Sequence, residues 1–484
     1  MVQLSARKFL ALCVFISGFI ICFGLRRPVP PGFIAAEVFL TILGLFVFGS
    51  FKYRLSKNAL TYGSILVIGS SFWTGWRPPS SSFSSLPFLV RHFLTLRGLD
   101  ELVHADTMLF ILGLTFFVSV IAQTRLLESI SFSVLRKNKG AVLPTIAVMT
   151  ALVAAASGVL DGVSMIGLLI RTMAIILLLA KAKKEDIIFA VMMSTVVTTV
   201  GGMWLAYGEP PNLIMKENLR PFLTNGFFLR YCLPAAVGSY LIALWNLRKV
   251  LGGRFVDAVP EELPGDREQR NRSQKIAGLS FVPFVGLLIW HAFDHAVPLF
   301  LASFGGFAVA LLGIVSAPAL RAAAFREAAQ EYKEYLFLFP LFLSITLLQK
   351  SGFFEGLADS LRHGVEAFGI SLVAFLQFIG AALLSALLDN NVVADFASRA
   401  LRGLDMAVMH LFSMAQIAGY AAGGCWTHIG SAQSVVAYAF ILKEVDPRTT
   451  PFQWVKAMTP VIIEIFVLMA VVITAESALL KYLH

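Results

Sequence analysis

The stretch LLSALLDNN, residues 383–391, places one aspartate and two asparagines inside a long apolar region. A carboxylate within the hydrocarbon of a membrane is costly, so such a residue faces a cavity, a cation or a proton. A related stretch occurs earlier, because SGVLDG at 157–162 matches SALLDN at 385–390. Both copies have the pattern S-x-x-x-D, and we expect Asp161 and Asp389 to mark two related sites.

The composition predicts an all-α integral membrane protein. Of the 484 residues, 57% are hydrophobic and 14% are charged, whereas soluble domains have about 25% charged residues. Repeated apolar runs of about 18–20 residues indicate spanning helices. The net charge of +10 fits cytoplasmic loops better than nucleic-acid binding, because no soluble basic domain is present to carry it. The four cysteines are scattered without a CxxC pair, so neither a disulfide framework nor a zinc site is predicted.

Eleven apolar segments are predicted to span the membrane. They lie near 9–25, 33–50, 59–76, 107–124, 186–216, 226–246, 276–293, 297–316, 335–349, 407–441 and 457–478. Regions 142–180 and 369–403 are each interrupted at the middle by polar residues, and we predict two re-entrant helical hairpins there, with pairs of ordinary spans as the alternative. The run at 9–25 is interpreted as a retained extra helix rather than a signal peptide, because Arg26 and Arg27 follow it in place of a small-residue cleavage site.

The chain is predicted to contain two repeats of five spans each. GGMWLAYG at 201–208 matches GGCWTHIG at 423–430, and residues 109–128 parallel residues 336–355. An odd number of spans makes the second repeat enter from the opposite side, which is an inverted repeat. The predicted boundaries are an N-terminal helix at 1–32, a first repeat at 33–246, a cytoplasmic linker at 247–275 and a second repeat at 276–484. The broken helices are 186–216 and 407–441.

Lys and Arg predict the orientation. With the N-terminus in the cytoplasm, about twice as many of them fall on the cytoplasmic side as outside. The C-terminus then lies outside the cell. The expected location is a bacterial inner membrane.

Each hairpin places a hydroxyl four residues before a carboxylate, as Ser157 with Asp161 and Ser385 with Asp389. On a continuous helix this spacing would bring both groups to one face. The alternative is that each aspartate only caps the helix that follows. Capping is compatible with binding of a hard cation such as Na⁺, because an interrupted helix also frees carbonyl oxygens. Asn390 and Asn391 add amide oxygens at the second tip.

The two G-G-x-W-x-x-x-G motifs predict a break in each of two other helices. Such breaks occur at membrane depth only where the backbone is buried in protein or lines a cavity. A simple kink remains the alternative for either copy alone. The polar residues expected at the breaks are Thr198, Thr199, Glu209 and Asn212 in the first, and Thr427, His428, Ser431, Gln433 and Ser434 in the second. We interpret Glu209 as facing the membrane edge, Arg171 as extending toward Lys181–Lys184, and Asp395 with Arg399 as an i, i+4 pair.

These motifs resemble those of the ion transporter superfamily, which includes NhaD-type Na⁺/H⁺ antiporters, arsenite permeases and symporters of divalent anions. The similarity covers about 33–478. The hairpins are most similar to the NhaD branch, because the Ser-Asn-Thr triplet typical of dicarboxylate symporters is absent. The resemblance implies that Ser157, Asp161, Ser385, Asp389, Asn390 and Ser431 take part in cation and proton exchange. The first hairpin departs from the family at Gly162, where Asn is usual.

The expected function is therefore secondary exchange of Na⁺ or Li⁺ for H⁺, with Asp161 and Asp389 as the Na⁺ ligands. The alternative within transport is an anion or arsenite-type permease, or a Na⁺-coupled carboxylate transporter. An enzyme is not expected, because the histidines form no HExxH-like set, although intramembrane aspartate proteases remain a rival class. No nucleotide-binding motif and no cofactor are predicted. The expected partners are membrane lipid, small inorganic ions and a second copy of the chain in a homodimer, without nucleic acid.

Overall fold

The computed structural model describes residues 6–26, 31–51, 57–73, 94–257, 267–294, 296–336 and 338–483. These residues form helices joined by short connections and contain no strand, only one isolated bridge between Ala141 and Phe255. The prediction of an all-α protein is therefore confirmed.

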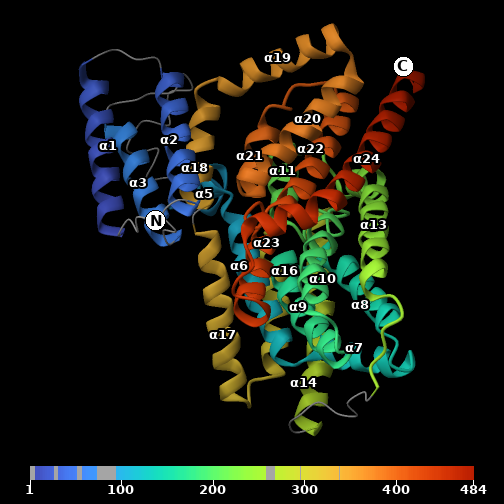
Figure 1. Cartoon of the computed structure of the whole chain (residues 1–484). Coiled ribbons are helices and arrows are strands. Elements are labelled where there is room, and N and C mark those ends of the chain that lie inside the picture. Colours follow the sequence, from blue (N-terminus) through green and yellow to red (C-terminus); the bar gives the residue numbers. More distant parts are fainter. Residues whose placement is uncertain are drawn as a thin grey trace.

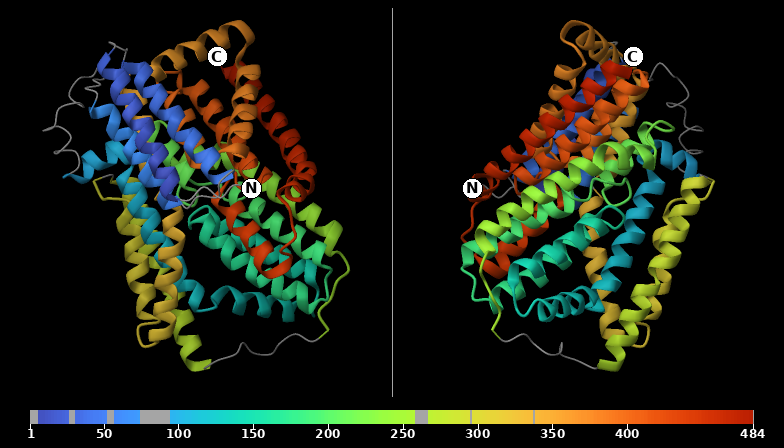
Figure 2. Two further views of the ribbon diagram at one scale, coloured as in Figure 1. Left: turned by 60° about the vertical axis from the view of Figure 1, so that its left-hand side comes forward. Right: turned by 90° about the vertical axis from the view of Figure 1, so that its right-hand side faces the viewer.

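The N-terminal part contains three helices on one flank of the molecule, next to α18 (Figures 1 and 2). The helices from there to residue 123 are α1 (Ala6–Arg26), α2 (Pro31–Phe51), α3 (Lys57–Trp73), α5 (Leu96–Val103) and α6 (Ala105–Gln123). The last residues of the predicted span 59–76 lie outside the described residues.

The next segment contains the first predicted hairpin and broken helix. Its elements are α7 (Leu126–Lys137), α8 (Val142–Ser157), α9 (Gly162–Leu179), α10 (Lys184–Thr195), the π-helix η2 (Val196–Val200), α11 (Pro210–Asn218), α12 (Asn225–Phe227), the π-helix η3 (Phe228–Cys232) and α13 (Leu233–Leu251). Residues 158–161 separate α8 from α9, and residues 201–209 separate η2 from α11.

The remaining elements contain the second predicted hairpin and broken helix. They are α14 (Arg267–Leu279), α15 (Phe281–Phe293), α16 (Phe300–Leu312), α17 (Pro318–Tyr332), the 3-10 helix η4 (Lys333–Tyr335), α18 (Leu338–Lys350), α19 (Phe353–Phe368), α20 (Ile370–Leu387), α21 (Asn390–Arg399), α22 (Met406–Trp426), α23 (Ala432–Phe440), the π-helix η5 (Ile441–Val445) and α24 (Pro451–Leu483). Helix α13 continues to Leu251 and α14 begins at Arg267, so both ends of the predicted linker 247–275 are helical.

Helices α5, α7, α17 and α19 were not predicted. Helices α7 and α19 each follow a spanning segment and precede a hairpin, and each buries only a few residues, including Phe132 and Phe354. Helix α17 is rich in alanine and charged residues, so an apolar-run criterion misses it. It packs along α6 and carries Glu327 and Glu331.

Six helices in the described residues are long and apolar enough to cross a membrane: Ala105–Gln123, Gly162–Leu179, Asn225–Leu251, Glu268–Phe293, Ile370–Leu387 and Pro451–Leu480. The two predicted broken helices, 186–216 and 407–441, are not among the six. Helices α8 and α9 occupy the lower part of Figure 1, whereas α20 and α21 occupy the upper part. This arrangement supports hairpins that enter from opposite sides.

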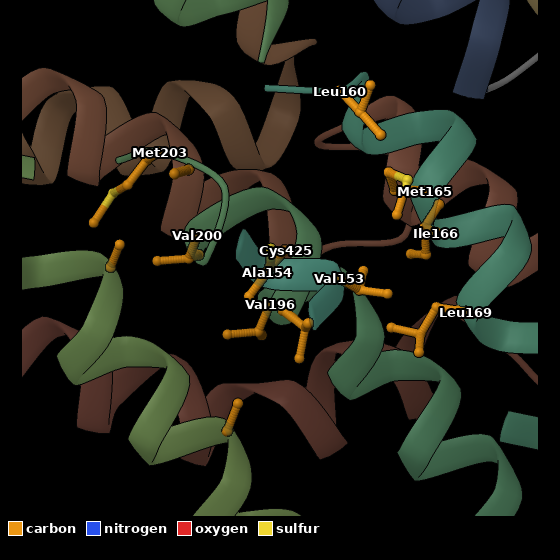
Figure 3. Close-up of a cluster of buried hydrophobic side chains, with 14 of the residues drawn as sticks. Val153, Ala154, Leu160, Met165, Ile166, Leu169, Val196, Val200, Met203 and Cys425 are labelled. Atoms are coloured by element: carbon orange, nitrogen blue, oxygen red, sulfur yellow. The ribbon is translucent and has the colours of Figure 1, made fainter. Parts of the chain in front are cut away.

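The main apolar core surrounds the first hairpin. In Figure 3, Ala154 of α8 lies beside Val196 and Val200 of η2, and Val153 lies toward Ile166 and Leu169 of α9. Such close packing holds membrane helices together, because lipid supplies no hydrophobic driving force between them. The core fixes the position of the hairpin tip.

Candidate functional site

Both hairpin tips begin a helix with an aspartate. Helix α8 ends at Ser157 and Asp161 is the N-cap of α9; likewise Ser385 lies in the last turn of α20 and Asp389 is the N-cap of α21. The interpretation that each Ser and Asp share one helix face is therefore wrong, because the chain turns between them. The Ser157 hydroxyl is buried and has no hydrogen-bond partner among the described residues.

Asp161 is almost fully buried and accepts several hydrogen bonds. The backbone N–H groups of Val163 and Ser164 donate to its carboxylate over 3.3 and 3.1 Å. The hydroxyl of Tyr335 donates to Oδ1 over 3.3 Å, and Ser164 Oγ lies 2.9 Å from Oδ2. Helix α9 therefore begins at a carboxylate that side chains from η4 and α9 surround.

Asp389 is only partly buried and is capped through one oxygen. Its Oδ1 accepts from the backbone N–H of Asn391 over 2.9 Å and from Asn391 Nδ2 over 2.6 Å. The Oδ1 atom of Asn391, whose residue is 3% exposed, has no hydrogen-bond partner among the described residues. Capping is thus present at both tips, and the second tip retains a buried acceptor for a ligand.

The glycines of both G-G-x-W-x-x-x-G motifs pack against the hairpin tips. Gly208 N donates to Gly158 O and Gly162 N donates to Gly208 O, each over 3.0 Å. A Cβ at Gly208 would overlap the carbonyl oxygen of Ser157, and one at Gly430 would lie 2.6 Å from that of Ser385. The repeated motif therefore exists because backbone must touch backbone at each tip, and a simple kink does not explain it.

Most polar residues predicted at the first break have partners within the protein. Thr198 and Thr199 are buried in η2, where Thr198 Oγ1 donates to the Ser194 carbonyl over 3.0 Å. Asn212 in α11 accepts a 2.5 Å hydrogen bond from the hydroxyl of Tyr420 on α22. These contacts join the first broken helix to the second.

The same holds at the second break. Thr427 Oγ1 donates to the Ala386 carbonyl over 2.7 Å, and Ser385 Oγ donates to the Tyr420 carbonyl over 2.8 Å. Ser431 is the N-cap of α23 and accepts from the backbone N–H of Ser434. Asn390 is buried behind the tip. These residues shape the site rather than line an open space.

Glu209 does not face the membrane edge. It is 2% exposed, and Gln433 Nε2 donates to its two carboxylate oxygens over 2.8 and 3.0 Å. A Cβ at Gly162 would overlap Glu209 Oε1. The glycine that replaces the usual asparagine therefore makes room for a buried carboxyl group from the facing break.

A cavity of about 250 Å³ lies against the second hairpin tip. Its walls come from α6, α9, α17, α23 and the tip of the second hairpin. The polar side chains that line it are Ser119, Ser164, Arg171, Glu327, Gln330, Glu331, Tyr335, Asp389 and Asn391. Of the residues predicted from the sequence, only Asp389 and Asn391 line this space, and Asp161 lies directly behind Ser164.

Arg171 extends into this region rather than toward Lys181–Lys184. Its Nη2 donates to Glu327 Oε1 over 3.0 Å, and its side chain is 56% exposed. Arg171 follows Asp161 by ten residues, and Arg399 follows Asp389 by the same number. This repeated spacing is the signal by which the sequence marks Arg171 as part of the site.

Arg399 has different surroundings. Its Nε donates to Asp395 Oδ1 over 2.8 Å, which confirms the predicted pair, and Asn218 Nδ2 donates to the same oxygen over 2.7 Å. His104 Nε2 lies 3.4 Å from that oxygen, and Thr346 also contacts the guanidinium. All these residues are buried, so the polar cluster on the second hairpin is closed, whereas that on the first hairpin borders a cavity.

Interrupted helices, buried carboxyl groups and a central cavity define a multi-pass membrane transporter. The family model described as citrate transporter (CitMHS) matches residues 72–409. The chain therefore belongs to the citrate transporter family.

Two curated relatives are described only as uncharacterized transporters. One is from Mycobacterium bovis, with 24% identity over 60% of this chain and 66% of the relative. The other is from Mycobacterium tuberculosis, with 24% identity over 59% of this chain and 65% of the relative. The chain thus spans just under two thirds of the length of these relatives, and their names indicate no substrate.

Among solved structures, the chain is similar to the YdaH transporter of Alcanivorax borkumensis. The TM-score is 0.53, with 15% identity over 82% of this chain and 90% of the other. At this identity the likeness shows the fold alone.

Proposed function

We propose that this protein is a secondary transporter that couples a small carboxylate such as citrate to protons or cations. The main support for the proposal is the cavity at the hairpin tips. It is lined by the guanidinium of Arg171 and by the carboxyl groups of Glu327, Glu331 and Asp389. Membership of the citrate transporter family supports a carboxylate as cargo. A volume of about 250 Å³ also suits a small organic anion better than a single bare ion.

The charges that line the cavity explain why binding of an anion has to be coupled to binding of protons or cations. Arg171 attracts a carboxylate, but Glu327, Glu331 and Asp389 line the same space and repel it. Like charges a few ångströms apart in a low dielectric interact by several kcal/mol. Protons or cations on these carboxyl groups remove the repulsion, so they and the anion increase each other's affinity.

Arg171 has the geometry to recognise the anion. A guanidinium presents five N–H donors in a planar fork, and among the described residues the ion pair with Glu327 uses one hydrogen bond, from Nη2. The remaining donors are available for a carboxylate of the cargo. In this proposal Glu327 holds the guanidinium of Arg171 in place and competes with the cargo for its N–H donors.

The second tip supplies the cation side of the site. Asp389 and the unpaired Oδ1 atom of Asn391 offer hard oxygen ligands. Asp161, which the sequence also predicts as a Na⁺ ligand, lies behind Ser164. We assign Na⁺ or H⁺ binding to these carboxyl groups, and the cavity to the carboxylate.

The cavity lies among α9, α17 and the end of α6, which Figure 1 draws in the lower part of the molecule, toward α14. We propose that this is the cytoplasmic side, as the Lys and Arg distribution predicts. Alternating access then requires the first hairpin region to close as the second one opens.

The test uses purified full-length protein in liposomes loaded with unlabelled citrate. We expect exchange for external radiolabelled citrate, and accumulation when a pH gradient is imposed. Arg171→Lys should weaken the apparent citrate affinity by about tenfold, because the bidentate fork is lost. Arg136→Lys on α7, outside the cavity, is the matched control and should behave as the wild type.

The second candidate is Na⁺/H⁺ exchange without an organic cargo, which the excess of carboxyl groups over guanidinium in the cavity favours. In the same liposomes, a Na⁺ pulse without citrate would then move protons, and Asp389→Asn would abolish the movement. Absence of citrate exchange together with this proton movement would replace the carboxylate proposal with the exchanger.

A further inference from the structure

One hydroxyl group joins two carboxyl groups at the base of the cavity. Ser164 Oγ lies 2.9 Å from Asp161 Oδ2 and 2.8 Å from Glu331 Oε1. A serine hydroxyl has a single proton, so it donates to only one of these oxygens. The other contact is a hydrogen bond only if that carboxyl group carries a proton and donates to Oγ. The geometry therefore requires that one of the two carboxyl groups, Asp161 or Glu331, is protonated.

The hydrogen bonds around the pair assign this proton to Glu331. Asp161 accepts from two backbone N–H groups and from the hydroxyl of Tyr335, at the positive end of α9, and all of these favour a carboxylate. For Glu331, the hydrogen bond within the described residues is the one to Ser164. The Glu331 O–H then donates to Ser164 Oγ, and the Ser164 O–H donates to Asp161.

The opposite wall indicates that a ligand reaches this proton. Asn391 lines the same cavity, and its Oδ1 atom is buried with no hydrogen-bond partner in the part of the chain that the structure describes. Its orientation is fixed, because its Nδ2 donates to Asp389. A buried acceptor without a donor calls for a ligand that brings a donor or a cation. Glu331 and Ser164 border that same space, whereas Asp161 lies behind them.

We infer that Glu331 carries the coupling proton, shares it with Asp161 through Ser164 and exchanges it with water in the cavity. When the proton leaves as hydronium, two carboxylates remain on one hydroxyl, and their repulsion favours either reprotonation or a cation near Asn391. The other titratable groups around Glu331 are Asp161, Arg171, Glu327, Tyr335 and Asp389. The inference rests on the proposed coupling, but the protonation itself is tested without transport.

The transport test uses Glu331→Gln, which mimics the protonated state permanently. We expect this variant to exchange labelled citrate at equal pH on both sides but to accumulate none above the external concentration under a pH gradient. Glu366→Gln, at an exposed position of α19 that does not line the cavity, is the matched control and should still accumulate citrate. Accumulation by Glu331→Gln equal to that of the wild type would overturn the inference.

The second test is an infrared measurement on purified protein, which needs no substrate. At neutral pH the wild type should show the C=O band of a protonated carboxylic acid. This band should vanish in Glu331→Gln, persist in Glu327→Gln and shift in frequency in Ser164→Ala, where the acid loses its acceptor. A band that is unchanged in both Glu331→Gln and Ser164→Ala would overturn the inference. If wild-type protein shows the band but exchanges no citrate, the proposed cargo fails and the proton site stands.

Discussion

At the scale of single residues, contact between backbones at the tips determines the site. Gly208 and Gly430 lie where a side chain would collide with the last residues of α8 and α20. Only glycine lets the broken helix approach the hairpin closely enough for the hydrogen bonds between Gly158, Gly162 and Gly208. These contacts place Asp161 and Glu209 beside each other.

Gly208→Ala is therefore expected to destabilise the protein by at least about 1–3 kcal/mol, because the new Cβ overlaps the Ser157 carbonyl. Gly380→Ala on α20 is the control, since a Cβ there meets nothing within 4 Å, and a gain of about 0.5–1 kcal/mol is expected in a helix interior. Thermal unfolding in detergent measures both. A Gly208→Ala protein as stable as the Gly380→Ala protein would contradict the packing described.

The residues that the sequence predicted are those with local signals. Asp161 and Asp389 cap helices within their own hairpins, so a short pattern suffices to find them. Glu331 escaped prediction because its partner Ser164 lies 167 residues away, and only folding brings the two together. Glu209 was placed incorrectly because nothing local shows that Gln433 lies opposite it.

At the scale of elements, the two hairpins carry corresponding arginines in opposite situations. Arg399 lies in a closed cluster with Asp395 and is 4% exposed in its side chain, whereas Arg171 borders the cavity and is 56% exposed. Breaking a buried ion pair leaves an uncompensated charge, while an exposed pair contributes little.

We expect Arg399→Gln to cost about 3–5 kcal/mol, because it leaves Asp395 buried without its main partner. Arg171→Gln should change stability by no more than about 1 kcal/mol. Denaturation of the two variants side by side measures the difference. Equal losses in the free energy of unfolding would contradict the difference in burial between the Arg399 and Arg171 ion pairs.

Element boundaries were predictable where apolar runs are interrupted by polar residues, as at both hairpins. They were not predictable for α17, whose alanine and charged residues lack an apolar run, nor for α7 and α19, which bury few side chains. The structure places α17 in the site because it packs along α6, and this is a tertiary contact without a local signal.

At the scale of the whole molecule, the cavity borders α9 of the first hairpin and the tip of the second, whereas the Arg399 cluster within the second hairpin is closed. Ser119 and Thr346 occupy corresponding positions in the two repeats, 227 residues apart, as do residues 109 and 336. Ser119 lines the cavity, whereas Thr346 lies in the buried cluster with Arg399. Both residues are 3% exposed, so the difference between them is that Ser119 borders a cavity that water and a small reagent can enter.

We expect a membrane-impermeant thiol reagent to label Ser119→Cys from the side of α14, and Thr346→Cys to be protected. The described native cysteines Cys13, Cys232 and Cys425 are buried and add little background. Labelling of both positions from the same side would contradict the inverted arrangement of the two repeats.

The most direct test of the account is the rate at which Ser119→Cys is labelled with and without citrate, at two pH values. If the cavity binds a carboxylate together with protons, citrate should slow the labelling, and it should do so more strongly at the lower pH. A labelling rate that citrate leaves unchanged at both pH values would contradict the claim that this cavity is the transport site for a proton-coupled carboxylate.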